Sequence, residues 1–360
     1  MQAWAAELGF SRIGVSDLDV TDASTRLRSW LDAGMHGSMQ WLERHAELRA
    51  QPDRLVPGAL RAVTVRMDYL PRDMPAENEG WRKIEWQRIE DPSRATVSAY
   101  ARGRDYHKVM RTRLQQLADR IAAEIGPFGH RAFTDSGPVL EVEMAARSGL
   151  AWRGKHTLAL SRDAGSMFFL GELFVDLPLE PTPPVDAHCG TCSACIDVCP
   201  TRAIVAPYVL DARRCIAYLT IEHDGPIPIE LRALIGNRVF GCDDCQLVCP
   251  WNKHAQRARV ADFEPKAWWN DALVLDLWGW DEATFLSRTE GTVLRRAGWQ
   301  RWRRNLAVAM GNALRAGSGD ARMIRAALRS AQHDASALVA GHIEWALAHA
   351  SPDHETKGAR

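Results

Sequence analysis

Apolar and polar positions alternate along the first half of the chain with two periods, one typical of strands and one typical of helices. Short apolar runs predict strands over residues 12–15, 62–69, 131–134 and 166–175. Helical spacing of apolar residues predicts helices over residues 23–33 and 106–125, and a further helix from residue 139. The alternation of the two kinds of element predicts one α/β domain over residues 1–180.

Proline-rich and polar stretches divide the rest of the chain. Residues 71–94 are polar and contain prolines, which predicts a surface excursion, and four prolines within residues 178–186 mark the end of the α/β domain. A second domain is predicted over residues 181–260, and a helical C-terminal region over residues 261–360. Within that region, stretches at 323–330 and 338–348 predict a helical-repeat pair that must pack on its neighbours. The predicted fold is therefore α+β and multidomain.

The composition limits the partners that the chain can have. Its 360 residues contain 45 Lys plus Arg and 45 Asp plus Glu, so a polyanion can bind only at a local patch. No run approaches the ~20 apolar residues that span a bilayer, and no secretory signal is recognisable. We therefore expect a soluble, cytoplasmic protein with no membrane partner. Because the chain opens inside a predicted helix, we also expect native residues to precede it.

All eight cysteines fall between residues 189 and 249. The first run has CxxCxxCxxxCP spacing, in which three cysteines bind one [4Fe-4S] cluster and the fourth binds a second cluster. The later CxxCxxxCP run has valine where its first cysteine is expected, so the single cysteine between the runs completes that set. The first cluster is assigned to Cys189, Cys192, Cys195 and Cys249. The second cluster is assigned to Cys199, Cys215, Cys242 and Cys245.

Structural zinc and disulfides are the alternatives for these cysteines. Zinc also takes four thiolates, but one tetrahedral ion has no use for the third close cysteine of a CxxCxxC run. Disulfides are not expected in a cytoplasmic protein. Two clusters that exchange ligands lie close together, which predicts that the chain transfers single electrons.

A cationic segment, RRAGWQRWRR at residues 295–304, stands out in this neutral chain. Its arginines suit contacts with nucleic-acid phosphates, and we take Arg301, Arg303 and Arg304 as candidates. The alternative is an amphipathic helix with a solvated basic face, because Trp299 and Trp302 are three residues apart and share one face. Elsewhere the chain lacks both GxGxxG after a strand and GxxxxGK, so a Rossmann or P-loop nucleotide site is not expected.

Seven motifs together resemble the epoxyqueuosine reductase family over almost the whole chain. They are YARGRDYHK (100–108), TDSGPVLE (134–141), GLAWRGKHTL (149–158), FFLGEL (168–173), DARRCIAYLTIE (211–222), GNRVFGCDDCQLVCPWN (236–252) and TEGTVLRRAGWQRWRRN (289–305), in addition to the first cysteine run. The resemblance implies a cobalamin-dependent enzyme, related to reductive dehalogenases, that reduces epoxyqueuosine to queuosine at the wobble position of tRNA.

The resemblance also implies cofactors and partners. The cofactors are cob(II)alamin, reduced to cob(I)alamin during turnover, and two [4Fe-4S] clusters. Residues 1–180 would bind cobalamin without a protein histidine on cobalt, and residues 261–360 would contact tRNA. The partners would be tRNA carrying epoxyqueuosine in its anticodon and an external low-potential electron donor, and we expect a monomer. Some relatives have a longer helical extension than this chain, whose polar tail ends at residue 360.

Site residues follow from the matched motifs. Asp135 would be the proton donor, kept protonated by an apolar pocket, although its surroundings also suit a helix N-cap before residue 139. Tyr106, Lys155 and His156 would line the substrate side; alternatively they are a packed tyrosine, a surface charge and an interior histidine. Cobalamin contacts are expected from Asp135 and from Arg49, Ser98, Ala159, Leu170 and Ala217.

Two other functions fit part of the sequence. A ferredoxin-like electron carrier would need the cysteine runs, but it would need neither the 180-residue N-terminal domain nor the arginines. A reductive dehalogenase for small molecules usually carries a twin-arginine export signal, which is not found in this sequence.

Overall fold

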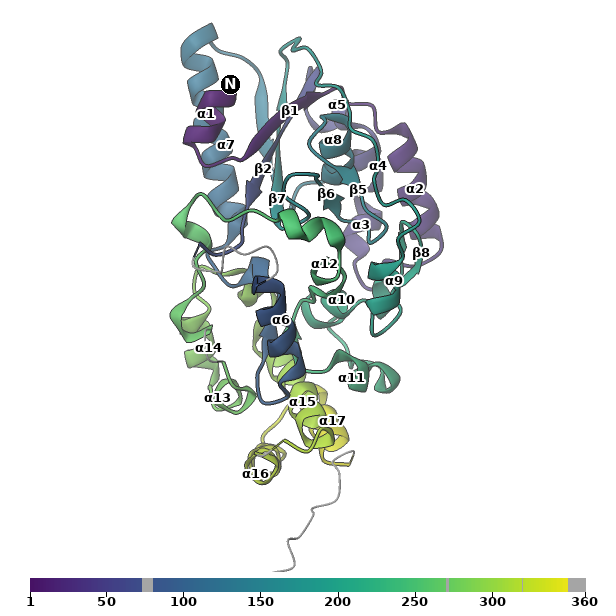
Figure 1. Ribbon diagram of the computed structural model, residues 1–360, viewed down its shortest axis with the longest axis vertical. Coiled ribbons are helices and arrows are strands. Elements are labelled where there is room, and N and C mark those ends of the chain that lie inside the picture. Colours follow the sequence, from purple (N-terminus) through teal and green to yellow (C-terminus); the bar gives the residue numbers. More distant parts are fainter. Residues whose placement is uncertain (73–79, 270–271, 319, 349–360) are drawn as a thin grey trace, which may run out of the picture.

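The computed structural model describes residues 1–72, 80–269, 272–318 and 320–348, and its N-terminal half is built around a four-stranded sheet of order β1-β2-β7-β4 (Figure 1). All three pairings in this sheet are antiparallel. Both central strands are buried along most of their length because both faces of the sheet are covered, and β7 is a nearly continuous apolar run whereas β2 also buries polar residues. The strands are β1 (Arg12–Ser16), β2 (Arg61–Asp68), β7 (Phe168–Val175) and β4 (His130–Phe133).

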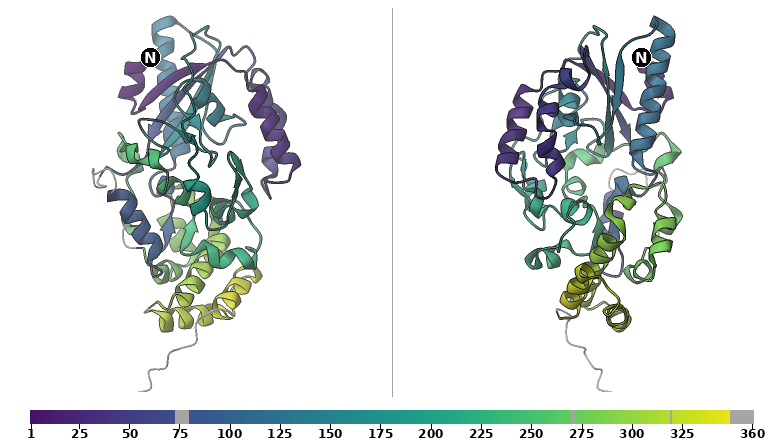
Figure 2. Two further views of the ribbon diagram at one scale, coloured as in Figure 1. Left: turned by 45° about the vertical axis from the view of Figure 1, so that its right-hand side comes forward. Right: turned by 180° about the vertical axis from the view of Figure 1, so that it is seen from behind.

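Helices cover the two faces of this sheet unequally (Figures 1 and 2). One face carries α1 (Gln2–Glu7) and the long α7 (Tyr106–Ile125), which buries its apolar stripe as the spacing predicts. The other face carries α8 (Glu141–Arg147), which contacts both β2 and β7. Beyond α8 lie the short helices of the N-terminal segment. These are α2 (Thr21–Asp32), α3 (Gln40–Arg44), α4 (Ala46–Ala50) and α5 (Pro52–Leu55).

The cysteine-bearing region consists of short elements that pack against the N-terminal half. Its β10 (Arg238–Phe240) pairs in parallel with β3 (Thr96–Val97), and one hydrophobic core contains residues from all three predicted domains. The domain boundaries therefore stay a prediction. The other elements here are α9 (Ala194–Val198), β8 (Ile204–Ala206), β9 (Val209–Leu210), η2 (Ala212–Arg214), α10 (Ile216–Ile221), α11 (Ile229–Ile235), α12 (Asp244–Leu247) and η3 (Pro250–His254). Short elements of the N-terminal half are η1 (Ala99–Ala101), β5 (Trp152–Arg153) and β6 (Ala159–Leu160).

The predicted surface excursion is wrong in part, because helix α6 (Gly80–Glu90) lies within it. Trp81 is 2% exposed, and Glu85 is buried in an ion pair with Arg102, whose Nη1 lies 2.7 Å from Glu85 Oε1. The pattern failed to indicate this helix because one of its inward positions is a glutamate. Residues 73–79, also in this excursion, lie outside the described residues.

The C-terminal region is helical, as predicted. The repeat pair, α16 (Ala321–Ala331) and α17 (Ala337–Ala348), packs on α15 (Gly298–Arg315), and the polar tail after residue 348 lies outside the described residues. In the part of the chain that the structure describes, no helix is long and apolar enough to cross a membrane. The remaining elements are η4 (Ala261–Phe263), η5 (Ala267–Trp269), α13 (Val274–Trp278), α14 (Glu282–Arg288) and η6 (Val293–Ala297).

The candidate arginines of α15, Arg301, Arg303 and Arg304, make contacts inside the protein. Arg304 is 0% exposed, and its Nη1 donates to the carbonyls of His223 and Gly225, each at 2.7 Å. The expectation that Arg304 contacts a phosphate is therefore wrong. Arg301 Nη1 donates to the carbonyl of Ile221 at 2.8 Å, which joins α15 to α10. The guanidinium of Arg303 stacks 3.3 Å from the ring centre of Trp278 on α13.

Arg301 and Arg303 are thus half-buried contacts between helices. The cationic segment was predicted to be exposed and to bind phosphate because sequence alone does not show which backbone carbonyls an arginine side chain will contact. In this run, Arg295 and Arg296 are exposed.

We predict that Arg304→Ala destabilises the fold by about 3–5 kcal/mol, because each buried carbonyl left without a donor costs ~1–3 kcal/mol. Urea denaturation followed by tryptophan fluorescence measures the change. Arg295→Ala removes the same charge at an exposed position and should leave the midpoint close to that of the parent protein. Equal midpoints for the two variants would contradict the structural role of Arg304.

Candidate active site and cysteine groups

Asp135 lies in the loop after β4 and is held by side chains from another element. Its carboxylate accepts hydrogen bonds from the Tyr106 hydroxyl and from His107 Nε2, the latter at 3.1 Å. Both donors belong to the first turn of α7, whose N-cap is Asp105. Asp135 also has a positive φ of 52°, unusual for a residue with a side chain.

The N-cap interpretation of Asp135 is wrong. Helix α8 begins at Glu141 with Leu140 as its N-cap, so Asp135 lies too far upstream to cap it. Its side chain is instead 56% exposed, and it forms part of the wall of a cavity.

The expectation that an apolar pocket keeps Asp135 protonated is also wrong. Burial acts to raise the pKa of Asp135, but hydrogen bonds from His107 and Tyr106 outweigh it and leave that pKa below its usual value. Burial acts to lower the pKa of His107, whereas its hydrogen bonds to Asp135 and Asp105 leave that pKa raised. The contact therefore favours the ionised form of Asp135 and the protonated form of His107.

The cavity beside Asp135 measures about 820 Å³, near the upper end of the ~300–1,000 Å³ of small-molecule sites. Its walls come from α2, the loop that leads into α8, and residues 207–210, and they are mostly apolar. Arg49 lines it as well, and burial lowers the pKa of this guanidinium although Asp135 and Glu141 act in the opposite direction. The structure thus brings together two of the residues expected to contact the cofactor.

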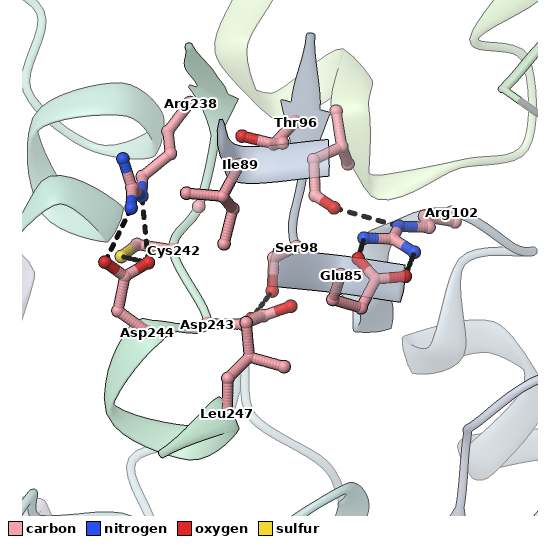
Figure 3. A pocket seen from close by; sticks show the side chains of 12 residues that line it. Glu85, Ile89, Thr96, Ser98, Arg102, Arg238, Cys242, Asp243, Asp244 and Leu247 are labelled. Carbon is pink, nitrogen blue, oxygen red and sulfur yellow. Dashed lines mark hydrogen bonds and ion pairs between the residues drawn. The ribbon is translucent and has the colours of Figure 1, made fainter. Parts of the chain in front are cut away.

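The other expected cofactor contacts fall into two sets. Ala159 and Leu170 pack in one apolar cluster with Val142, which lines the cavity. Ser98 instead lines a small cavity of about 20 Å³ beside Cys242 and donates a hydrogen bond to Asp243 (Figure 3). Ala217 lies on α10, two residues after Cys215.

The three expected substrate-side residues separate in the structure. Tyr106 is with Asp135, but Lys155 Nζ donates to the carbonyls of Gly190 and Cys192 at 2.7 and 2.8 Å, on the first cysteine run. His156 is buried, and burial lowers its pKa to about 4, so this imidazole is a neutral interior group.

None of the eight cysteines, all of which the structure describes, forms a disulfide, and their mutual influences divide them into two groups. Burial raises the pKa of Cys249 to about 11, and the neighbouring thiols of Cys189, Cys195 and Cys192 act in the same direction. Members of the second group also act on one another. Cys215 acts on Cys245, Cys199 acts on Cys215, and Cys245 acts on Cys242 after the larger influences of Asp244 and Arg238.

These neighbours match the two sets that the spacing predicts, although the ligand sets themselves stay a prediction. Cys195 of the first group also acts on Cys245 of the second, so the two groups lie close together.

Polar groups around the cysteines suit iron-sulfur clusters. The Trp152 indole Nε1 is buried without a partner among the described residues, and its ring packs with Cys189 and Cys249. Cluster sulfurs accept such N–H hydrogen bonds. Beside the second group, Arg238 is paired with Asp244, their Nη2 and Oδ2 atoms 2.6 Å apart, and its positive charge favours the thiolate of Cys242 (Figure 3).

Sequence reasoning missed three residues near Asp135. His107 lies directly after Tyr106 in a matched motif, and Glu141 ends the motif that contains Asp135. The third residue, Glu172, is 0% exposed in the middle of β7. A single acid inside the apolar run FFLGELFV was the signal that could have found it.

Comparisons with known proteins agree with this geometry. Residues 49–136 match a family described as epoxyqueuosine reductase QueG, DUF1730, and residues 188–252 match a 4Fe-4S double cluster binding domain. An epoxyqueuosine reductase of Alicycliphilus denitrificans is 59% identical, covering 97% of this chain and 96% of that protein. The epoxyqueuosine reductase of Burkholderia pseudomallei is 55% identical, covering 96% and 90%.

Two solved structures share the fold. A crystal structure of epoxyqueuosine reductase with an epoxyqueuosine-modified tRNA-Tyr stem loop superposes with a TM-score of 0.83 at 26% identity, over 96% of this chain and 88% of that one. A Bacillus subtilis epoxyqueuosine reductase, whose aspartate-bearing catalytic loop is swung out of the active site, gives the same TM-score, identity and coverage.

We predict that paired cysteine variants will distinguish the exchanged ligand sets from unexchanged ones. Cys199→Ala/Cys215→Ala removes two ligands of one cluster if the sets are exchanged, so about four of about eight iron atoms per chain should remain. Cys199→Ala/Cys249→Ala removes one ligand from each cluster and should impair both. Iron analysis and electron paramagnetic resonance of the reduced proteins measure this. Impairment of both clusters in Cys199→Ala/Cys215→Ala, as in Cys199→Ala/Cys249→Ala, would mean that Cys199 and Cys249 bind the cluster of their own run.

Proposed function

The chain belongs to the epoxyqueuosine reductase family, and we propose that it reduces the epoxide of epoxyqueuosine in tRNA to give queuosine, with electrons that pass through two [4Fe-4S] clusters. The observation that carries this proposal is Asp135, held by Tyr106 and His107 at the wall of a large cavity. An electron carrier would have no use for such a group.

Cobalamin is the cofactor that we propose for this cavity. When bound, it supplies the electron-transfer chemistry of its cobalt to the substrate. The large apolar volume and the buried cation Arg49 suit a bulky, amide-bearing ligand. Ala159 and Leu170 would support the cavity wall, and Ser98 and Ala217 would contact the cofactor from the side of the second cysteine group.

Asp135 and His107 would act together as the proton donor. Removing the epoxide oxygen requires that this oxygen be protonated as its bonds to carbon break. The pKa of His107 is raised by its hydrogen bonds, and Asp135 lines the cavity, so a proton on His107 can move toward the cavity along their 3.1 Å hydrogen bond. Tyr106 orients the carboxylate through its hydroxyl and stacks on Phe169, 4.2 Å away between ring centres.

Electrons would enter through the first cluster from an external low-potential donor and pass to the second cluster, whose ligands lie nearer Ser98 and Ala217. Lys155 places a positive charge on the loop of the first cluster. The neighbouring thiols of the two groups support a short path between the clusters.

The phosphate contacts for tRNA need to be reassigned within residues 261–360. Arg295 and Arg296 are the exposed arginines of the cationic segment. Arg296 is paired with Glu222 at 2.7 Å, and its charge acts on Asp135, so it lies on the side of the molecule where the anticodon must enter. We propose these two arginines as backbone contacts in place of Arg301, Arg303 and Arg304.

We predict that Asp135→Asn binds both clusters and cobalamin but reduces epoxyqueuosine at least ~10²-fold more slowly, because an amide cannot pass on a proton. Mass spectrometry of nucleosides from a modified stem loop measures turnover, and visible spectra measure cofactor content. Ser136→Ala changes a polar group of the same loop and should retain activity. Full activity of Asp135→Asn would exclude Asp135 from proton transfer.

We predict that Arg295→Ala/Arg296→Ala flattens the slope of log affinity for tRNA against log salt by ~1.4–1.8 units, because two phosphate contacts are lost. Arg322→Ala/Arg329→Ala makes the same change of charge on α16, at the far end of the molecule (Figure 1), and should leave the slope unchanged. Equal slopes for the two variants would place the phosphate contacts elsewhere.

A further inference from the structure

Glu172 is a carboxyl group at the centre of the sheet. It lies on β7 between Thr64 of β2 and Phe133 of β4, and it is 0% exposed. Among the residues that the structure describes, no backbone or side-chain N–H or hydroxyl group donates a hydrogen bond to either of its carboxyl oxygens. An ionised carboxylate in such a place is strongly unfavourable, so burial raises the pKa of Glu172 well above its usual value.

Glu141 is the group that reaches Glu172. It is the first residue of α8, which packs on β7, and the two carboxyl groups lie close enough to share a hydrogen bond when one of them is protonated. A carboxylate can only accept hydrogen bonds, so this contact requires a proton on at least one of the two groups. Burial and the negative charge of Asp135 raise the pKa of Glu141 to about 8, while the hydrogen bond from Glu172 acts to lower it.

Glu141 also forms part of the cavity wall, beside Asp135. Its Oε1 accepts a hydrogen bond from the backbone N–H of Asp135, which fixes the left-handed turn of that residue. The cavity is therefore lined by two carboxyl groups with opposite protonation, Asp135 ionised and Glu141 protonated at neutral pH. The charged or titratable groups that face Glu141 are Asp135, Tyr106, His107, Glu172 and Arg49.

The reaction needs more protons than Asp135 and His107 hold. Both carbon–oxygen bonds of the epoxide break, two electrons are taken up, a carbon–carbon double bond forms, and the oxygen leaves as water after it has gained two protons. The pair of Asp135 and His107 supplies one of these protons. A second donor must reach the same cavity within one turnover.

We propose that Glu141 supplies the second proton and that Glu172, through its hydrogen bond to Glu141, stabilises the carboxylate that remains. This inference rests on the proposed reduction of an epoxide. Glu141 is a proton donor to the cavity, and Glu172 is a positioning residue that acts through Glu141 and keeps its proton transferable near neutral pH.

The resting protein tests the proton on Glu141 without any turnover. Infrared difference spectra across a pH titration should show a protonated carboxyl band of the wild-type chain that disappears with a midpoint near pH 8. Glu141→Gln should lack this titrating band. Glu143→Gln, on the same helix but paired with Arg26 at 2.8 Å, should keep it. A titrating band that persists in Glu141→Gln would overturn the proposal.

Turnover tests the use of that proton. At saturating tRNA, wild-type kcat should fall as pH rises past about 8, since Glu141 then loses its proton. Glu141→Gln should lower kcat about 10²-fold and remove that decline. Glu172→Met should move the decline to higher pH, because the Glu141 carboxylate loses its hydrogen-bond donor, and Glu172→Gln should restore it because an amide N–H can donate instead.

The outcomes separate this inference from the proposed function. If the wild-type chain does not reduce epoxyqueuosine, the proposed function fails, whatever the infrared titration shows. If the wild-type chain is active and Glu141→Gln keeps both its rate and its decline above pH 8, the second-donor role is overturned while the function stands. Should Glu172→Met fail to fold, Glu141→Gln and the infrared titration decide the question.

Discussion

An ionised carboxylate can be kept at the wall of a mostly apolar cavity only when donors from the surrounding structure hold it, and in this protein the first turn of α7 holds Asp135. The hydroxyl of Tyr106 and the imidazole of His107 fix the position of the carboxylate. Because α7 packs on both β7 and β4, and β4 leads into Asp135, the packing of this helix on the sheet sets the distance between donors and acceptor. The chemistry that we assign to the cavity depends on this contact.

The cysteine groups impose a second constraint, because their members come from three separate segments of the chain. Cys215 is the N-cap of α10, and Cys242 lies just before α12. The second group is therefore complete only when α10 and α12 pack close together. Arg304 of α15 helps to hold α10 in place, because its guanidinium donates hydrogen bonds to backbone carbonyls of the segment that follows α10. The buried Arg304 therefore helps to position the cysteines through which electrons are expected to pass.

Sequence patterns predicted the helices and strands in which apolar side chains recur with a single helical or strand period. The helix over 106–125 and the strands around it are present because their inward positions are apolar. The patterns failed where a charged group is buried and paired. Helix α6 was not predicted because it buries Glu85, which is paired with Arg102. Arg304 was predicted to be a surface charge, although it is buried and bonded to backbone carbonyls. Spacing predicts the cysteine sets, which stay a prediction, but it contains no information about Glu172, a residue of β7 that lies beside Glu141 of α8.

Asp135 could be named from a matched motif, but its protonation could not. The motif indicates an acid, whereas the surroundings of the site raise the pKa of His107 through its hydrogen bonds and that of Glu141 through burial. These assignments need donors from α7 and β7 that are distant in sequence. The motif therefore indicates the position of the chemistry, and the packing of the sheet with its helices determines how the protons are held.

The central claim is that this chain removes the epoxide oxygen with two electrons. The most direct test is an anaerobic single turnover, in which protein loaded with both clusters and cobalamin is mixed with an epoxyqueuosine-modified anticodon stem loop and a measured amount of a low-potential reductant. The account predicts one queuosine for every two electrons consumed, with the loss of one oxygen atom seen by mass spectrometry of the nucleoside. Consumption of electrons while the epoxide remains intact would contradict it.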